Sequence, residues 1–192
     1  MAEIERVPLD MGGFEVNSYV VHAPEGDVIV DAGAEPEKIL ARLEQPVAAI
    51  LITHGHRDHV GALEEVRRGT NAPVYAHPTD AEGSGVRGYE PLEDGQILEI
   101  AGATIRVLHT PGHSPGSVTF VVGSDQIVGD LVLPGSVGRT DISGSSWEEI
   151  ELSIRKVMPF WDGSTRLYSG HGPVLRAMEE LESNPYLPLG IL

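Results

Sequence analysis

The chain has 192 residues, of which 41% are hydrophobic and 22% charged, and this balance fits one ordinary globular domain spanning residues 1–192. The 29 Asp and Glu residues outnumber the 13 Lys and Arg residues, so the surface would repel nucleic acid, and the absence of cysteine excludes disulfides and thiolate ligands to a metal. No apolar run approaches the roughly 20 residues of a membrane helix and no secretory pattern begins the chain, so we expect a cytoplasmic protein without a membrane partner.

Short strands separated by turns are predicted for the first half of the chain. The segments 17–22 and 27–31 flank the turn signal Ala-Pro-Glu-Gly, which is typical of a hairpin. Strands and helices then alternate, which favours parallel pairing of the strands. The predicted order is helix 36–43, strand 47–53, helix 61–69 and strand 72–77.

The second half is predicted to repeat this order loosely. Its segment Ser146-Trp-Glu-Glu is like a capping box and starts a helix that ends before Pro159. The predicted order is strands 96–100, 104–109, 117–122 and 126–128, helix 146–158, strand 166–169 and helix 174–181. Strands followed by helices, twice over, predict an α/β protein with two sheets packed face to face and helices outside.

Three of the eight histidines fall within the segment Thr-His-Gly-His-Arg-Asp-His at 53–59. It directly follows an apolar run, so its side chains are predicted to lie on a loop at the end of a buried strand, where α/β folds commonly place their sites. His54 and His56 are close enough in sequence to bind the same ion, while Asp58 and His59 can reach a second ion. Imidazole nitrogen and carboxylate oxygen are ligands of divalent metals such as zinc. A chance polar loop is the less favoured interpretation.

Three more candidate ligands follow, each near the predicted end of a strand. His113 lies in the turn Thr-Pro-Gly-His-Ser-Pro-Gly-Ser, whose prolines and glycines limit its conformations. Asp130 ends Ile-Val-Gly-Asp and has two oxygens that can bridge two metals, and His171 lies in Ser-Gly-His-Gly. Because all the ligand segments leave strand ends, we expect them to converge on one edge of the sandwich. Together they can hold two divalent ions, zinc foremost, with iron or manganese as alternatives.

The pattern His-x-His-x-Asp-His, followed by a distant His, Asp and His, resembles the hallmark of the metallo-β-lactamase superfamily. The resemblance covers the chain from Asn17 to His171. It implies an αββα sandwich of two mixed sheets flanked by helices, and two metal positions that share Asp130. By this resemblance the first position is held by His54, His56 and His113, and the second by Asp58, His59 and His171.

Two segments look like the glyoxalase II-like branch of thioester hydrolases. They are the turn around His113 and the stretch Gly-Ser-Val-Gly-Arg-Thr-Asp at 135–141. Full-length glyoxalase II carries a C-terminal helical domain with basic residues for glutathione, whereas Arg176 is the sole basic residue after Gly172 in this sequence. The resemblance is therefore to the short single-domain relatives of glyoxalase II.

The expected activity is hydrolysis of a small-molecule thioester or ester. Two metals that share a water lower its pKa toward neutrality and supply a bridging hydroxide as nucleophile. Asp58 is the expected catalytic residue as well as a ligand, since its second oxygen can orient the proton of the hydroxide. A thiolate leaves easily, so a strong general acid is not required.

Three alternatives remain open. The Gly-Arg-Thr-Asp string also looks like the persulfide dioxygenases, which implies an oxidoreductase with one iron held by His54, His113 and Asp130. The same centre can instead hydrolyse lactones or other esters. The last alternative is a metal-binding module without catalysis, which is disfavoured because every hallmark ligand is present.

Arg139 and Tyr89 are the candidate substrate contacts. Arg139 can anchor a substrate carboxylate, but an ion pair with Asp141 that stabilises the loop is the favoured interpretation. Tyr89, in Gly-Ser-Gly-Val-Arg-Gly-Tyr, is predicted to lie on a mobile lid over the site or on a plain surface loop. The remaining histidines are expected to be structural, with His109 the nearest to a ligand-orienting role; they are His22, His77 and His109.

Overall fold

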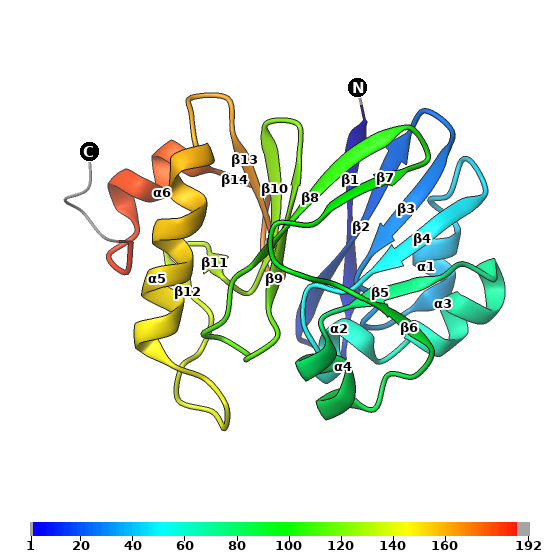
Figure 1. Cartoon of the computed structure of the whole chain (residues 1–192), viewed down its shortest axis with the longest axis horizontal. Coiled ribbons are helices and arrows are strands. Elements are labelled where there is room, and N and C mark those ends of the chain that lie inside the picture. The colour runs from blue at the N-terminus through cyan, green and yellow to red at the C-terminus, as the bar shows by residue number, and fades with distance from the viewer. Residues whose placement is uncertain (1, 188–192) are drawn as a thin grey trace.

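The structure, a computed structural model, describes residues 2–187. Within these residues two six-stranded sheets face each other, and helices cover their outer faces (Figure 1). Helices α1 (Pro36–Leu40) and α3 (Leu63–Thr70) lie outside the first sheet, and α5 (Trp147–Val157) lies outside the second. The predicted αββα sandwich of two mixed sheets is confirmed.

The first sheet joins an antiparallel part to a parallel part. Its strands, in their order across the sheet, are β1 (Glu3–Asp10), β2 (Glu15–Ala23), β3 (Gly26–Val30), β4 (Val47–Leu51), β5 (Val74–Ala76) and β6 (Tyr89–Pro91). The first three strands pair antiparallel, and β3 to β6 pair parallel. Because β3 and β4 are parallel neighbours, the chain leaves both of them at the same edge of the sheet.

The second sheet is also mixed. Its strands, in their order across the sheet, are β14 (Leu175–Arg176), β13 (Arg166–Ser169), β10 (Asp125–Gly129), β9 (Val118–Val122), β8 (Ala103–His109) and β7 (Ile97–Ile100). The strands β10 and β13 are parallel neighbours, and every other pair is antiparallel. The carboxyl ends of β10 and β13 therefore meet at one edge.

Consecutive residues of the central strands enter different apolar cores. In β3, Val28 and Val30 lie in the core between the two sheets, whereas Ile29 lies in the core beneath α1 and α3. In β4, Leu51 likewise lies in the core between the two sheets, and Ile50 lies in the core beneath α1 and α3. Since side chains alternate between faces and both faces are covered, these strands are continuous apolar runs in the sequence.

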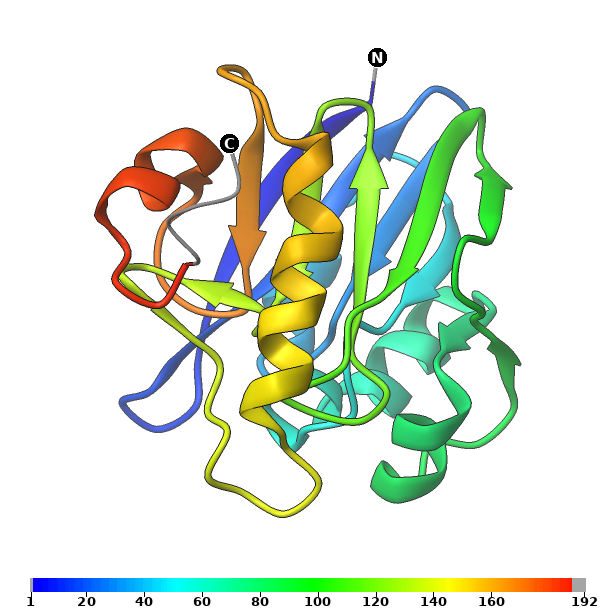
Figure 2. The ribbon, with the colours of Figure 1, turned by 60° about the vertical axis from the view of Figure 1, so that its left-hand side comes forward.

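Helix α5 closes a third core against the outer face of the second sheet (Figure 2). Ile150 and Ile154, four residues apart, are fully buried on one face of the helix, while Leu152 is 65% exposed on another. The Ser146 side chain accepts a hydrogen bond from the backbone N–H of Glu149, which is the helix start that the sequence predicts.

Several short elements were missing from the prediction. The strand β1 is an edge strand that contains Pro8, and proline is tolerated at an edge because its missing N–H leaves no ladder bond unmade. The helix predicted at 36–43 ends at Leu40. The other additions are β6, β14, α2 (Arg57–Val60), α4 (Pro78–Ser84), β11 (Val132–Leu133), β12 (Ser136–Val137) and the short 3-10 turn η1 (Met158–Phe160).

The helix predicted at 174–181 was wrong in its first turn. Leu175 pairs with Leu167 as part of β14, and the helix α6 (Ala177–Ser183) begins only after that pairing ends. A two-residue strand has too few residues to show a period, so only the neighbouring strand β13 identifies it.

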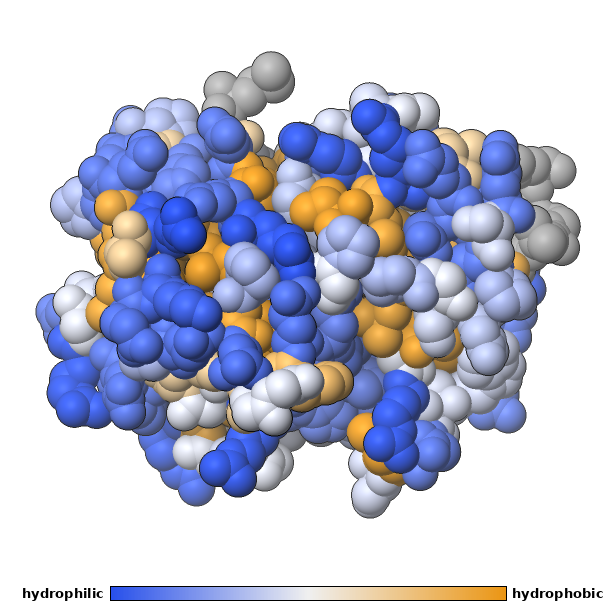
Figure 3. All heavy atoms as spheres, turned by 180° about the vertical axis from the view of Figure 1, so that it is seen from behind, coloured by the Kyte–Doolittle hydropathy of each residue, from blue (hydrophilic) through white to orange (hydrophobic). Residues whose placement is uncertain are grey.

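Within residues 2–187, none of the helices combines the length and the hydrophobicity needed to cross a membrane. The face drawn in Figure 3 is mostly hydrophilic, with hydrophobic side chains showing in separate patches. This surface agrees with a chain in which acidic residues outnumber basic residues by more than two to one.

Docking of α5 can be tested with two truncations on the same helix. Ile154→Ala should lower the free energy of unfolding by about 2–5 kcal/mol, because it opens a cavity in a buried core. Leu152→Ala, at an exposed position, should change it by about 0.5 kcal/mol or less. Urea unfolding of both variants measures the difference, and equal losses would contradict the observed orientation of α5.

Candidate metal centre

The seven candidate ligands lie at one edge of the sandwich, where the ends of four strands meet. His54 and His56 follow β4, and Asp58 and His59 lie on the one-turn helix α2 that comes next. His113 follows β8, Asp130 follows β10 and His171 follows β13. The two sheets therefore both supply ligands, in the arrangement expected from the strand ends.

The ligand atoms fall into three overlapping groups. In each group the nitrogen or oxygen atoms lie within 4.8 Å of one another. The groups are His54, His56 and His113; then His54, His59 and Asp130; then Asp58, His59 and His171. All seven residues singled out in the sequence are thus brought together.

Asp130 lies between imidazoles of the two ligand sets that the sequence analysis assigns to separate metal positions. Its Oδ2 lies 3.3 Å from Nε2 of His113, of the predicted first position, and 3.4 Å from Nε2 of His171, of the predicted second position. Asp58 Oδ2 lies 3.4 Å from the same Nε2 of His171 and 3.8 Å from Nε2 of His59. One carboxylate therefore faces imidazoles from both sides of the centre.

Two of the histidines are oriented by a carboxylate that the sequence analysis did not identify. Asp31 accepts a hydrogen bond from Nδ1–H of His59 at 2.7 Å and another from the Thr53 hydroxyl, also at 2.7 Å. Since that hydroxyl donates to Asp31, its oxygen accepts from Nδ1–H of His54, 3.0 Å away. Both imidazoles are left with an unprotonated Nε2 directed at the centre.

Backbone carbonyls orient two more imidazoles in the same tautomer. Nδ1–H of His113 donates to the carbonyl of Arg139 at 3.0 Å, and Nδ1–H of His171 donates to the carbonyl of Glu15 at 2.7 Å. His56 differs, because its Nδ1 points inward and lies 2.9 Å from Nε2 of His113. Four Nε2 atoms and one Nδ1 atom therefore converge on the centre.

Asp31 had one signal in the sequence. It is an acidic residue at the end of the apolar strand 27–31, one sheet neighbour away from the strand that precedes the histidine cluster. Its backbone has φ 59°, a left-handed conformation that aspartate tolerates better than most side chains. The Asp31-Ala-Gly sequence was interpreted only as the end of a strand.

The centre has the properties of a cation site. His54 Nε2, His59 Nε2 and Asp130 Oδ1 are buried without a hydrogen-bond partner among the described residues. Buried lone pairs without a partner are costly, and a divalent cation would satisfy all three. A donor set of imidazole nitrogen and carboxylate oxygen, without sulfur, suits zinc, iron or manganese. The residues therefore fit the metals that the sequence predicts.

The carboxylates of the centre stay ionised at any working pH. Burial opposes the charge of Asp130, but its hydrogen bond with His171 and the neighbouring imidazoles outweigh burial and lower its pKa to about 2. For Asp58 burial is likewise outweighed by the hydrogen bond with His171, and its pKa is also about 2. Both carboxylates are available as ligands without losing a proton.

The histidines of the two positions differ in their affinity for protons. Burial, helped by neighbouring imidazoles, holds the pKa of His54 well below its usual value and lowers the pKa of His56. Burial also opposes a charge on His171, but Asp130 and Asp58 outweigh it and raise the pKa of His171 to about 10. For His59, Asp31 outweighs burial and the pKa is raised. Protons therefore compete with a metal mainly at the second position.

A cleft of about 570 Å³ opens onto the centre. Apolar side chains of Phe14, Leu133 and Ile142 form part of its wall, and Arg139 lies at its edge. The Phe14 ring is 54% exposed and lies 4.8 Å from the ring of His171. The metal positions are thus accessible to a small molecule through a partly apolar opening.

Arg139 lines the cleft and also forms an ion pair with Asp141, so the structure is compatible with both interpretations of this residue. Its guanidinium donates to the Asp141 carboxylate at 2.9 and 3.1 Å, so the ion pair is present, and both side chains are 71% exposed. The same residue lines the cleft, and its carbonyl orients His113. Gly138 before it has no room for a Cβ, which would lie 2.1 Å from the carbonyl oxygen of Asp130.

The prediction for Tyr89 was wrong. Tyr89 begins β6, where it pairs with Val74 and packs against the core beneath α1 and α3, and it is not among the residues that line the cleft. The glycines before it suggested a loop, but three residues of strand pairing are enough to fix Tyr89 at the sheet edge. It is neither a lid nor a loop residue.

The three other histidines make contacts outside the ligand set. His22 lies between Asp27 and Glu5, far along the first sheet from the centre. His77 stacks on His109 with ring centroids 4.3 Å apart. His109 Nε2–H donates to the carbonyl of Pro115, in the loop that carries His113, so this residue acts on the loop and not on the ligand itself.

A histidine and aspartate cluster at the edge of an αββα sandwich defines a class of metal-binding proteins that are generally hydrolases. The chain belongs to this class: the profile of the Metallo-beta-lactamase superfamily matches residues 11–182, and the predicted family is confirmed.

Curated relatives match over nearly their whole length. The chain is 35% identical to the Bacillus subtilis protein named "Probable metallo-hydrolase YqgX", with 93% of this chain and 95% of that protein covered. It is 29% identical to the "Hydroxyacylglutathione hydrolase GloC" of Haemophilus influenzae, with 96% and 97% covered.

Two solved structures are close in fold. A crystal structure of BLEG-1, described as a B3 metallo-β-lactamase, has a TM-score of 0.87 and 32% identity and covers 96% of this chain and 99% of its own. A crystal structure of TTHA1623 in a di-iron-bound form has a TM-score of 0.81 and 37% identity, with 94% and 99% covered. The same overall fold therefore occurs in proteins with different names.

The contrast in histidine pKa predicts different proton release at the two metal positions. An imidazole ligand must be unprotonated, so at pH 8 binding at the second position should displace a proton from His171, whose pKa is about 10. Its affinity should then fall as the pH is lowered from 10, whereas His54 and His56 release no proton above pH 7.

Calorimetric titration of chelator-treated protein with Zn²⁺, in two buffers of different ionisation enthalpy, measures this release. Asp58→Ala, which removes the second position, serves as the control and should abolish most of it. Equal proton release in the control and the natural protein would contradict the assignment.

Proposed function

We propose that the protein is a dinuclear metal-dependent hydrolase of thioesters, with zinc as the metal. The observation that carries the proposal is the place of Asp130, whose one carboxylate faces His113 of the first position and His171 of the second. A carboxylate between two sets of imidazoles suits two neighbouring ions better than one ion. The proposal rests on this geometry and on the superfamily to which the chain belongs.

The seven candidate ligands would have distinct roles in this hydrolysis. His54, His56 and His113 would hold one ion, Asp58, His59 and His171 would hold the other, and Asp130 would serve both. When bound, such a pair of ions lowers the pKa of a shared water toward neutrality and polarises a carbonyl oxygen. Asp58, ionised because its pKa is about 2, accepts a hydrogen bond from the attacking water and so orients it.

The lining of the cleft favours a good leaving group. Apart from the candidate ligands, its described lining consists of Phe14, Leu133, Arg139 and Ile142. None of these side chains is a general acid that could protonate a leaving alkoxide or amine near neutral pH. A thiolate needs no such acid because thiols have a pKa near 8.5, and this supports a thioester over an ester, a lactone or an amide.

The rest of the cleft suits a substrate with an apolar part and a carboxylate. Phe14, Leu133 and Ile142 offer apolar surface for the acyl or thiol portion. The Arg139 guanidinium is solvent-exposed in its pair with Asp141, so a substrate carboxylate can replace Asp141 at little cost. The name of the 29% identical relative, a hydroxyacylglutathione hydrolase of nearly equal length, supports the same substrate class.

A substrate panel tests the proposal. Protein loaded with zinc should hydrolyse acyl thioesters of glutathione or of simpler thiols with a kcat/KM at least about tenfold above that for lactones and β-lactams, because only the thiolate leaves without an acid. Metal content should be near two ions per chain. A preference for β-lactams or lactones would contradict the thioester assignment, and one iron per chain with oxygen uptake on glutathione persulfide would assign dioxygenase chemistry instead.

Replacement of Asp58 tests the dinuclear arrangement. Asp58→Ala should reduce the zinc content from two ions to one and lower kcat by about 100-fold, since it removes a ligand and the water-orienting carboxylate together. The control is Arg57→Ala, an exposed position on the same one-turn helix, which should keep both ions and the activity. Full activity of Asp58→Ala would overturn the two-metal mechanism.

A further inference from the structure

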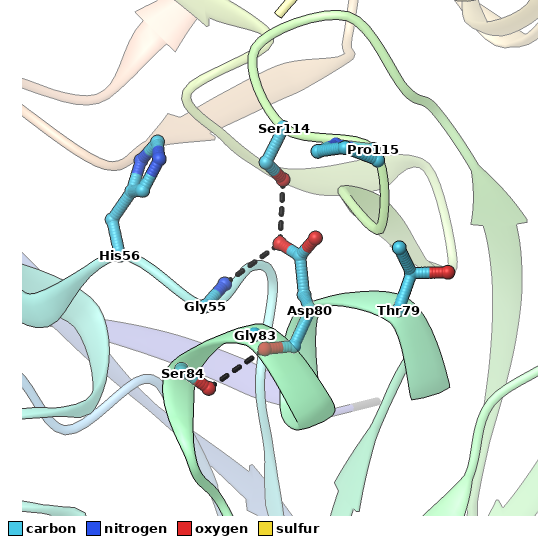
Figure 4. Close-up of a pocket in the computed structure, with 8 residues that line it drawn as sticks. All are labelled: Gly55, His56, Thr79, Asp80, Gly83, Ser84, Ser114 and Pro115. Atoms are coloured by element: carbon cyan, nitrogen blue, oxygen red, sulfur yellow. Dashed lines mark hydrogen bonds between the residues drawn. The ribbon is translucent and has the colours of Figure 1, made fainter. Parts of the chain in front are cut away.

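A buried carboxylate outside the ligand set connects two of the metal-binding loops. Asp80 lies on α4, after β5 of the first sheet, and is 8% exposed. It borders a second hollow, of about 240 Å³, whose lining also includes His56 (Figure 4). The proposed hydrolysis of thioesters assigns no role to Asp80.

Both oxygens of Asp80 accept hydrogen bonds from groups on these two metal-binding loops. Oδ2 accepts from the backbone N–H of Gly55 at 2.8 Å and from the hydroxyl of Ser114 at 2.5 Å. Oδ1 accepts from the backbone N–H of Gly116 at 2.6 Å. Figure 4 shows the bonds to Gly55 and Ser114 meeting at one oxygen, with His56 next to Gly55.

These donors are the chain neighbours of the first-position ligands. Gly55 lies between His54 and His56, and Ser114 directly follows His113. The loop with Gly55 leaves the first sheet, while the loop with Ser114 leaves the second. Asp80 thus ties the loops of two different sheets together at the point where their imidazoles meet.

The fit around Asp80 requires glycine at both backbone contacts. A Cβ on Gly55 would lie 2.6 Å from the carbonyl oxygen of Asp80, and a Cβ on Gly116 would lie 2.6 Å from its Oδ1. Neither glycine has a positive φ, so the need for glycine comes from close approach and not from backbone conformation.

The charge of Asp80 has no cation beside it. Among residues 2–187, no Lys, Arg or His forms an ion pair with its carboxylate. A buried charge held only by neutral donors is costly, and it is retained where those donors must be fixed in place.

We propose that Asp80 is a positioning residue for the first metal position, fixing His56 against His113 through Gly55, Ser114 and Gly116. It contacts neither metal nor substrate. The inference rests on the metal-binding part of the proposed function and is independent of the substrate. It predicts that loss of this carboxylate weakens the first position selectively.

The test compares two isosteric substitutions of buried carboxylates. Asp80→Asn removes acceptor capacity between the loops. Asp27→Asn is the control, because Asp27, near the start of β3, is also buried and accepts from two backbone N–H groups, of Glu44 and Gln45, with His22 as its other partner. Both variants are made in the natural chain and in the Asp58→Ala background, where only the first position remains.

Zinc-loaded proteins are titrated with a chromophoric chelator to measure the affinity of each position. Asp80→Asn should weaken the first position by about 10–100-fold and leave the second within about threefold. Asp27→Asn should lower the melting temperature without changing either affinity. The visible absorption of Co²⁺ bound in the Asp58→Ala background should change in Asp80→Asn and not in Asp27→Asn, since it reports ligand geometry.

Ser114→Ala provides a second test of the inference if Asp80→Asn does not fold. It removes one donor and should weaken the first position by a smaller factor, about threefold or more. An unchanged first-position affinity in Asp80→Asn or Ser114→Ala, with two ions in the natural protein, would overturn this inference and leave the proposed function standing. Failure of the natural protein to bind any metal would overturn both.

Discussion

The carboxylate of Asp130 and the imidazole nitrogens around it are electron-rich groups that the fold holds face to face. Unprotonated nitrogens and ionised oxygens repel one another, and three of them are buried without a hydrogen-bond partner in the described structure. Only a positive charge at the centre satisfies such an arrangement, whether it comes from protons or from divalent ions. The rest of the structure can be understood as the support that keeps these groups converged.

The support comes from both sheets and acts through backbone as much as through side chains. Asp31 orients His59 directly and His54 through Thr53. Carbonyls of Glu15 and Arg139, from a hairpin and a loop far apart in the chain, orient His171 and His113. Because each of these contacts fixes which ring nitrogen carries the proton, the tautomer of four imidazoles is set before any metal binds.

Close backbone packing is the second requirement of the centre. Gly170 lies so near Asp130 that a Cβ would be 2.0 Å from Oδ1, and the same problem arises at Gly138 and at the two glycines beside Asp80. The loops can therefore approach the ligands only where side chains are absent. This explains the glycine between the two ligands of Thr-His-Gly-His and the glycine before the ligand of Ser-Gly-His.

The candidate ligands of the centre could be predicted from the sequence alone. The ligand types, their place at strand ends and the order of strands and helices could all be read from local patterns, since imidazole and carboxylate spacing and apolar periodicity are local properties. Those patterns led to the αββα sandwich and to the gathering of the candidate ligands at one edge.

Only the tertiary structure decided which residues surround the ligands. Asp31 and Asp80 are single aspartates with no motif of their own, and their roles exist because parallel strands and two facing sheets bring distant loops within hydrogen-bonding distance. For Tyr89 the local sequence was misleading: the glycines nearby suggested a loop, but pairing with Val74 makes Tyr89 a strand residue. Contacts between segments far apart in sequence leave no periodic trace in either segment, so the ligands were visible in the sequence and their supports were not.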